Sequence, residues 1–392
     1  MPDEIEVTRD ADKRRRRLLK LTLAVLLLLC AMVVAIALRY INHPQPLPDL
    51  VPGAGHVYLR PHHLFAITGV DKPVGVAVSA DGKRVYVAES DGERLIKCFG
   101  SDGKLITKFQ IPNTFVGERA PVYLAVDSSG RVFVTDRTQG AIYVFTQDGQ
   151  MLDAIITPTM TLTEYVARHA GGLPAGTLFG INYIAKQVRY TLPGQAEQIL
   201  PLPNVEWSPL GLRFDRDGNL WVTDVLADNN RVHMIPRDVF TASSWLDFNP
   251  QTLDQVFGGS GVQEGQLSYP NVAMPDTRGR VYVSDGNNGR ISVWNTGGQY
   301  QFQMGKGVGD GALALPRGIW LDGKNRLYIA DAVEHDVKVF DVSGDEPTFL
   351  TTFGSFGVQS NNFNYPMDIA LDDNGRIYVA DRENNRVQVW SN

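Results

Sequence analysis

The C-terminal stretch PMDIALDDNGRIYVADRENNRVQVW, residues 366–390, contains three short apolar runs separated by turn residues. The runs are rich in Val, Ile, Ala and Tyr, and Asp, Asn and Gly stand between them. Short β-branched runs bounded by such turns predict successive antiparallel strands. Residues 270–294 repeat the pattern, with GRVYVSD and GRISVW following a proline.

Further copies of this unit occur along the chain. Equivalent units begin at six prolines, which are Pro73, Pro121, Pro209, Pro270, Pro316 and Pro366. Their spacings are 48, 88, 61, 46 and 50 residues. Units of about four strands at this period build a β-propeller, in which each unit is one blade. We therefore predict an all-β propeller.

The gap of 88 residues leaves the number of blades open. GTLFGIN at 176–182 resembles a second strand, and a degenerate unit beginning near Thr163 would give seven blades. A helix is the competing interpretation, because Thr161 and Glu164 fit a capping box and Gly171 fits a helix C-cap. Seven blades are favoured, and six are possible.

The two ends of the repeat region are complementary. The last unit stops at Trp390 after its third strand, whereas HLFAIT at 63–68 matches fourth-strand segments such as LTTF at 350–353. We expect this N-terminal strand to complete the last blade and to close a propeller that spans residues 56–392. Closure of this kind removes a free sheet edge.

The repeated motif carries a family resemblance over about residues 63–392. It reads Pro-x-Gly-Ile/Val-Ala, then Gly-x-Val/Ile-Tyr-Val-Ala-Asp, then Asn-Arg-Val/Ile-x-Val-Phe/Trp, and it resembles the NHL-repeat propellers. The resemblance implies the fold but no single function, since that family includes scaffolds, RNA-binding modules, extracellular sensor domains and a few lyases.

The N-terminus has the pattern of a membrane anchor. A basic run at 13–17 precedes eighteen uncharged residues from Leu21 to Leu38, which as a helix would be about 27 Å long. We predict a cytoplasmic tail over residues 1–17, a transmembrane helix over 18–38 and a Pro-rich stalk over 39–55. The protein would be a single-pass protein of the cell membrane with an extracytoplasmic propeller. A cleaved signal peptide ending at Ala35-Ile36-Ala37 and a lipoprotein signal at Cys30 are alternatives.

Charge and cysteine content exclude some classes of function. The net charge is −6, and because residues 1–40 hold eight Lys/Arg and five Asp/Glu, residues 41–392 hold 29 against 38, a net −9. An acidic body repels phosphate backbones, so we predict no nucleic-acid partner. Two cysteines exclude a disulfide scaffold.

The inner ends of the blades provide the candidate site. The residues after the six prolines are Val74, Val122, Leu210, Asn271, Arg317 and Met367. Four apolar groups, an amide and a cation do not form a cage for a hard cation, so no metal or other cofactor is predicted. We predict instead that a small polar or anionic ligand binds at the channel mouth, through Tyr123, Asn271, Arg317 and Asp368.

Two other groups of polar residues have a different interpretation. One acidic residue stands at the end of the second strand in each clear unit, and its repetition indicates a role in blade turns rather than catalysis; these residues are Glu89, Asp136, Asp224, Asp285, Asp331 and Asp381. Tyr165, Arg168 and His169 resemble the residue types of the amidoglycolate lyases of the NHL family. No catalytic residue is assigned.

The sequence thus predicts a membrane-anchored extracytoplasmic propeller that binds a protein, peptide or glycan partner. The alternative is a lyase or hydrolase with an active site at the channel mouth, similar to the amidoglycolate lyases. Strand alternation places the channel mouth on the face opposite the entry of the stalk, so we expect the working surface there.

Overall fold

The computed structural model describes residues 20–35, 60–182, 184–203, 207–237 and 255–391. The chain divides into two units, Met1–Gln45 and Pro46–Asn392. In the first unit, residues 20–35 form a helix whose side chains are all exposed. None of the helices in these described ranges has both the length and the apolar character needed to cross a membrane. The ends of the predicted 18–38 span lie outside them, so the anchor stays a prediction.

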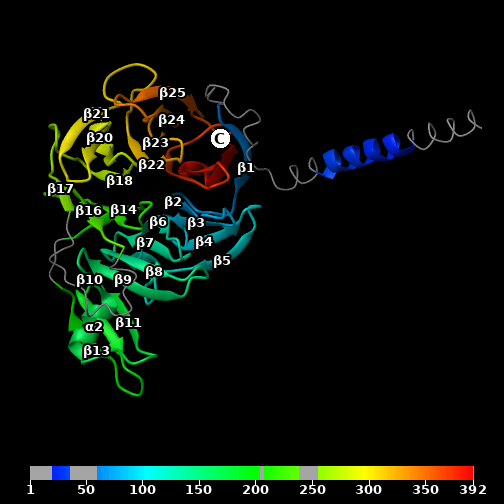
Figure 1. Ribbon diagram of the computed structural model, residues 1–392. Helices are drawn as coiled ribbons and strands as arrows, with labels where there is room; N and C mark the ends of the chain where they lie inside the picture. The colour runs from blue at the N-terminus through cyan, green and yellow to red at the C-terminus, as the bar shows by residue number, and fades with distance from the viewer. Residues whose placement is uncertain (1–19, 36–59, 183, 204–206, 238–254, 392) are drawn as a thin grey trace, which may run out of the picture. The chain divides into compact units, whose positions relative to one another are not determined.

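The second unit consists mainly of antiparallel sheets that surround an axis (Figure 1). We number the blades I to VI in chain order. Blade I contains β2 (Pro73–Val78), β3 (Arg84–Glu89), β4 (Ile96–Gly100) and β5 (Leu105–Phe109). Blade II contains β6 (Pro121–Val126), β7 (Val132–Asp136), β8 (Ala141–Phe145), β9 (Met151–Thr157) and the short β10 (Met160–Thr161). Blade III contains β14 (Pro209–Phe214), β15 (Leu220–Asp224), β16 (Arg231–Ile235) and β17 (Gln255–Gly258).

The C-terminal half supplies the other three blades. Blade IV contains β18 (Pro270–Pro275), β19 (Arg280–Asp285), β20 (Arg290–Asn295) and β21 (Tyr300–Met304). Blade V contains β22 (Pro316–Leu321), β23 (Arg326–Asp331), β24 (Asp336–Asp341) and β25 (Thr348–Phe353). Blade VI contains β26 (Pro366–Leu371), β27 (Arg376–Asp381), β28 (Arg386–Ser391) and β1 (His62–Ile67).

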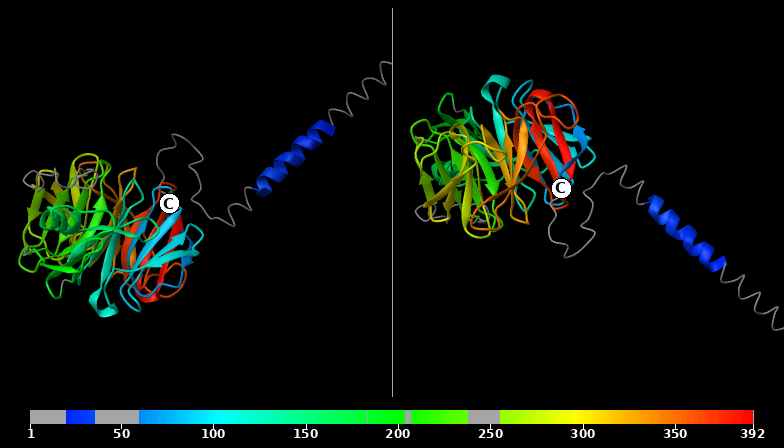
Figure 2. Two further views of the ribbon diagram at one scale, coloured as in Figure 1. Left: turned by 90° about the horizontal axis from the view of Figure 1, so that it is seen from below. Right: turned by 90° about the horizontal axis from the view of Figure 1, so that it is seen from above.

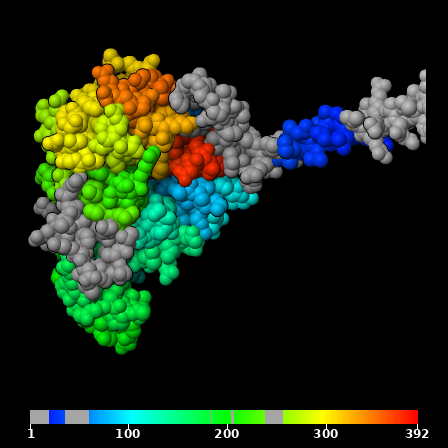
Figure 3. Space-filling view, viewed as in Figure 1, coloured from blue at the N-terminus to red at the C-terminus, as the bar shows by residue number. Residues whose placement is uncertain are grey.

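The described strands form a ring of six blades. The inner strands contact one another in a closed circle, in the order β2, β6, β14, β18, β22 and β26. The seventh unit favoured by the sequence does form a sheet, from β11 (Leu178–Asn182), β12 (Gln187–Thr191) and β13 (Gln198–Pro201). This sheet lies outside the circle, because β6 and β14 contact each other directly. It projects from the side of the ring (Figures 1 and 3). The prediction of a seventh blade is therefore corrected.

The helix considered as the alternative is also present. The α2 helix (Leu162–Ala170) has Thr161 as its N-cap, whose Oγ1 accepts a 3.2 Å hydrogen bond from the Glu164 N–H. It ends at Gly171 in the left-handed conformation. The insertion between blades II and III is thus a helix followed by a three-stranded sheet.

Alternation of small and large residues explains why the inner strands pack so closely. The third residue of the inner strand is glycine in blades I, III and V, and a larger residue in blades II, IV and VI. A Cβ atom on Gly75 would lie 2.0 Å from the Val122 carbonyl oxygen, and one on Gly211 would lie 1.6 Å from that of Asn271. The backbone of the next blade lies where a side chain would otherwise begin, so only glycine fits at these positions.

The N-terminal strand closes the ring. β1 pairs antiparallel with β28, with His62 opposite Ser391 and Ile67 opposite Val387. Its place in the sheet, β1-β28-β27-β26, is that of the fourth strand missing from the last repeat. This arrangement is the one expected from the sequence.

The acidic residues at the ends of the second strands hold the blades together. Each accepts a hydrogen bond from a backbone N–H in the connection leading to its own blade; Asp285 accepts from Ser268 at 2.6 Å, and Asp381 from Asn364 at 2.7 Å. The same bond occurs at the other four positions, Glu89, Asp136, Asp224 and Asp331. These contacts support the structural interpretation of this repeated residue.

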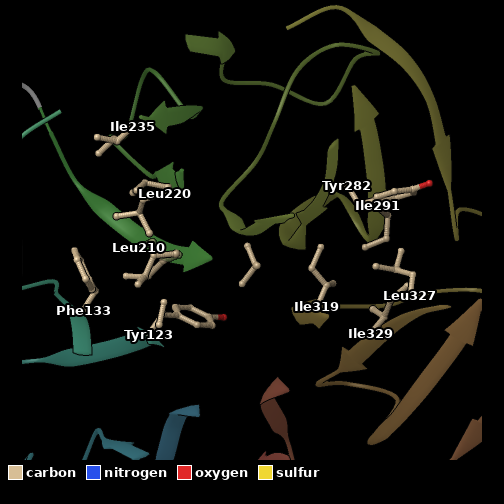
Figure 4. Packing of buried hydrophobic residues seen from close by; sticks show 14 of the residues in the cluster. Tyr123, Phe133, Leu210, Leu220, Ile235, Tyr282, Ile291, Ile319, Leu327 and Ile329 are labelled. Atoms are coloured by element: carbon tan, nitrogen blue, oxygen red, sulfur yellow. The ribbon is translucent and has the colours of Figure 1, made fainter. Parts of the chain in front are cut away.

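Strand alternation gives the ring two different faces (Figure 2). The connections between blades share one face with the turns between second and third strands, and we call this the loop face. The turns between first and second strands share the opposite face, the turn face, with those between third and fourth strands. Because β1 runs as a fourth strand, its first residue lies at the turn face. Buried clusters fill the ring, and in one of them Tyr123, Leu210 and Ile319 come from three inner strands (Figure 4).

Candidate functional site

Side chains from several blades meet around the axis of the ring. Tyr123 Oη in blade II donates a 3.3 Å hydrogen bond to Asn271 Oδ1 in blade IV. The same oxygen accepts a 3.1 Å hydrogen bond from Arg317 Nη1 in blade V. Blades II and IV are not neighbours, so the bond between Tyr123 and Asn271 passes blade III near the axis, whereas the bond from Arg317 joins the neighbouring blades IV and V. Three of the four predicted site residues therefore form one cluster, which we call the mouth cluster.

The mouth cluster is largely buried. Tyr123 and Asn271 are each 1% exposed, whereas Arg317 is half-buried. Burial raises the pKa of Tyr123 well above its ordinary value, and the negative charge of Asp368 adds to the effect. Tyr123 is therefore a neutral hydrogen-bond donor at physiological pH. Only Arg317 among the predicted residues reaches solvent.

The fourth predicted residue, Asp368, has another partner. Its Oδ1 accepts a 2.5 Å hydrogen bond from Arg213 Nη2, and its Oδ2 accepts a 3.0 Å bond from the Val76 N–H. Arg213 lies in blade III and Asp368 in blade VI, so this buried ion pair spans the axis of the ring between opposite blades. Burial raises the pKa of Asp368, and the Arg213 guanidinium opposes that shift.

Arg213 is not among the residues predicted from the sequence. Its position in the inner strand is occupied in the other blades by Ala77, Ala125, Met274, Trp320 and Ala370. A lone charge within the apolar run PLGLRF is the signal that could have identified it. Its guanidinium also bonds the carbonyls of Leu212 and Ile369, at 3.0 and 3.2 Å.

Two further residues, Arg137 and Tyr269, lie beside Arg317 at the end of the mouth cluster that faces solvent. The guanidinium carbons of Arg317 and Arg137 lie 5.8 and 5.7 Å from the centre of the Tyr269 ring. Asn271 Nδ2 donates a 3.0 Å hydrogen bond to the Tyr269 carbonyl, which connects this end to the buried part. Arg137 follows β7 on the loop face, and its side chain is exposed.

The same face presents a group of exposed apolar side chains. They belong to connections between blades or, in one case, to the turn after β23; we call them the apolar rim, and they are Phe115, Val116, Val262, Val308, Val333, Phe356 and Val358. Val308 is fully exposed and Phe356 is 67% exposed. On the turn face, none of the large apolar side chains in the described turns of the ring is exposed.

The residues that resemble lyase types lie away from the axis. Tyr165 Oη donates a 2.5 Å hydrogen bond to the Pro201 carbonyl, and His169 Nδ1 lies 2.8 Å from the Tyr165 carbonyl. Arg168 pairs with Glu164 on the same helix. The Tyr165 bond holds α2 against β13, and the other two contacts lie within α2. The three side chains therefore belong to the insertion and do not join the mouth cluster. Within the part of the chain described, no group of three or more His, Cys, Asp or Glu could hold a metal ion.

Comparison with known proteins confirms the resemblance to NHL-repeat propellers. Residues 363–390 match the NHL repeat, and residues 57–179 match the SMP-30/gluconolactonase/LRE-like region. Lactonase drp35 of Staphylococcus saprophyticus is 33% identical over 87 residues, which cover 21% of this chain and 27% of that protein. The B-box type zinc finger protein ncl-1 of Caenorhabditis elegans is 38% identical over 137 residues, which cover 34% of this chain and 15% of that protein. The chain thus spans about a quarter or less of these relatives.

Solved structures share the fold over most of the chain. Virginiamycin B lyase from Staphylococcus aureus is 16% identical, with a TM-score of 0.52 over 85% of this chain and 99% of that one. A gluconolactonase from Xanthomonas campestris is 16% identical, with a TM-score of 0.51 over 83% of this chain and 88% of that one. At such identities the likeness concerns the propeller fold alone.

Proposed function

We propose that this chain is a membrane-anchored extracytoplasmic propeller that binds a protein or peptide partner through its loop face. The apolar rim is the observation that carries the proposal. Large apolar side chains grouped on one face of a soluble domain mark an interaction surface, because burying them removes apolar area from water. Among protein, peptide and glycan partners, such a rim favours a protein or a peptide.

The construction of the rim supports the same function. Val262, Val308 and Val358 occupy equivalent places in three successive connections between blades, each directly after a glycine. The loop that contains Val358 is bonded to the strand β28, because Arg386 Nη1 donates a 3.1 Å hydrogen bond to the Val358 carbonyl. Arg290 Nη2 donates a 2.8 Å bond to the Gln263 carbonyl in the same way. Loops held in one conformation lose little entropy on binding, which favours affinity.

The anchor rests on the N-terminal sequence and on one further observation. The helix over residues 20–35 exposes its Leu and Val side chains, among them Leu28 at 72%. A bilayer would cover them, and the basic run at 13–17 orients the helix with the propeller outside. Protease added to intact cells or spheroplasts should then release the propeller. Digestion only after lysis of the inner membrane would reverse the proposed orientation.

The binding function can be tested by selecting, from a random display library, peptides that bind to the full-length chain. Peptides recovered from a random display library on the wild type should bind at least tenfold more weakly to a variant carrying Val262→Asp, Val308→Asp and Val358→Asp. The matched control carries Leu105→Asp and Leu152→Asp, which also place charges at exposed apolar positions but on outer strands. Undiminished binding to the rim variant, or equal loss in the control, would contradict the proposal.

A lactonase-type hydrolase is the second candidate, favoured by the match of residues 57–179 and by the similarity to lactonase drp35. Its reaction would take place at the mouth cluster, where Arg317, the member that reaches solvent, would donate a hydrogen bond to the carbonyl oxygen of a lactone. The test is proton release from a panel of sugar and aliphatic lactones at constant pH. Release by the wild type that falls in Arg317→Gln would favour this candidate, and rates equal to those of buffer would reject it.

A further inference from the structure

The Arg317 guanidinium has an incomplete set of partners. Its Nη1 bonds the neutral Asn271 side chain at 3.1 Å, while its Nε is buried and has no hydrogen-bond acceptor. No described carboxylate forms an ion pair with it. A charge partly removed from water is ordinarily paired, because desolvation without a counter-charge is costly. The half-buried position of Arg317 therefore indicates an anion that is supplied from outside the chain.

The neighbours of Arg317 restrain its guanidinium group in one position. Asn271 uses Oδ1 for Tyr123 and Arg317 and Nδ2 for the Tyr269 carbonyl, so its amide orientation is determined by three contacts. Tyr269 in turn lies against the Arg317 guanidinium. A cation with restrained neighbours loses little freedom when an anion binds.

A second cation increases the positive charge at the same place. Arg137 lies against the same Tyr269 ring, and among the described residues it too has no carboxylate partner. The deeper pair of Arg213 and Asp368 is neutral as a unit. The mouth therefore carries two uncompensated positive charges in a body whose residues 41–392 sum to −9. Such a local reversal of sign attracts anions.

We propose that Arg317 and Arg137 bind a carboxylate of the partner, either an acidic side chain or a C-terminus. This inference rests on the proposed function, because a peptide held by the apolar rim would carry that carboxylate to the mouth. Guanidinium groups match carboxylates with two parallel hydrogen bonds, which gives specificity as well as affinity. Arg317 Nη1 is occupied by Asn271, whereas no described residue accepts a hydrogen bond from Arg317 Nη2, which leaves that group for the carboxylate.

Calorimetric titration of the full-length chain with glutarate tests the site without a partner protein. Glutarate should bind the wild type, and Arg317→Gln and Arg137→Gln should each weaken it about tenfold or more, as expected for loss of a charge-assisted bond. Arg216→Gln is the matched control, since Arg216 is an exposed arginine on the turn face. It removes the same charge and should leave the affinity unchanged. Circular dichroism melting establishes that each variant is folded.

Several results would overturn the proposal. Failure of glutarate to bind the wild type, or equal binding by Arg317→Gln, would show that the mouth does not recognise carboxylates. Inorganic phosphate at equal ionic strength is the second ligand, and tighter binding of phosphate than of glutarate would reject the carboxylate assignment. The rim variant should bind glutarate like the wild type. Loss of peptide binding in that variant with glutarate binding retained therefore separates the rim from the anion site.

Discussion

Breaking the buried ion pair between Arg213 and Asp368, which joins opposite blades, should destabilise the ring severely. Arg213→Met removes the only described charge that faces Asp368 at ion-pair distance, and Asp368→Asn leaves the Arg213 charge buried. Removal of one partner from a buried pair costs about 3–5 kcal/mol of unfolding free energy. Arg213→Met also removes the hydrogen bonds to the Leu212 and Ile369 carbonyls, so we expect it near the upper end of that range. Because the two residues interact directly, the double variant should lose about 1–3 kcal/mol less than the sum of the single losses.

Urea unfolding followed by tryptophan fluorescence measures these losses. Trp320 is a suitable reporter, since its ring centre lies 5.5 Å from the Arg213 guanidinium. Arg216→Met, at an exposed site, is the control and should stay within about 0.5 kcal/mol of the wild type. Single losses below about 1 kcal/mol, or strictly additive losses in the double variant, would refute a bridging role for the pair.

Three other predictions concern the construction of the ring. Deletion of residues 60–69 should abolish cooperative unfolding, because β28 loses its partner strand, whereas deletion of 42–53 should not; equal melting of the two truncations would contradict closure by β1. Gly211→Ala should destabilise by about 1–3 kcal/mol or more, since its Cβ would lie 1.6 Å from the Asn271 carbonyl, while Gly117→Ala, with no atom within 4 Å, should be near neutral in urea unfolding. Burial raises the pKa of Asp153 to about 6, so the stability that this carboxyl contributes is complete below its unfolded pKa and is lost as pH rises through about 6. Asp153→Asn should therefore remove a slope of up to about 1.4 kcal/mol per pH unit between pH 4 and 6, and an unchanged slope would place the titration elsewhere.

The blades were predictable because each is encoded locally. A proline, an apolar run, a Gly or Asn turn and an acidic residue at the end of the second strand recur in each clear unit. In several units an arginine pairs with that acidic residue, as Arg290 does with Asp285 and Arg386 with Asp381. The closing strand was predictable for the same reason, since the last repeat lacked one element that the N-terminus supplied.

The number of blades depends on packing between units, and the sequence of a single unit does not determine that packing. GTLFGIN has a glycine, Gly180, at the third position of its strand, as β2, β14 and β22 do. A Cβ atom there would lie 2.9 Å from the Asn113 side-chain nitrogen rather than against the backbone of a neighbouring inner strand. The sequence of residues 176–182 therefore showed that they form a strand, but it did not show whether that strand belongs to the ring.

The candidate site was found in part for a related reason. Tyr123, Asn271 and Arg317 were chosen by their place at the start of inner strands, and they do meet. The partner of Asp368 could not be chosen in the same way, because Arg213 faces it only if blades III and VI stand opposite each other. A ring of six has opposite blades and a ring of seven has none, so the pairing follows from the number of blades.

Closure by β1 has a consequence for the order of synthesis. The first of the described strands, β1, pairs with the last of them, β28, across 329 positions between His62 and Ser391. Joining ends that far apart costs about 5 kcal/mol of chain entropy. At 5–20 residues per second, β1 waits about tens of seconds for its partner with its hydrogen-bonding edge free. A chain cut short before β28 leaves the edge of β1 unpaired, and an unpaired edge strand can pair with another chain. Blade VI can therefore form only after residues 386–391 have been made.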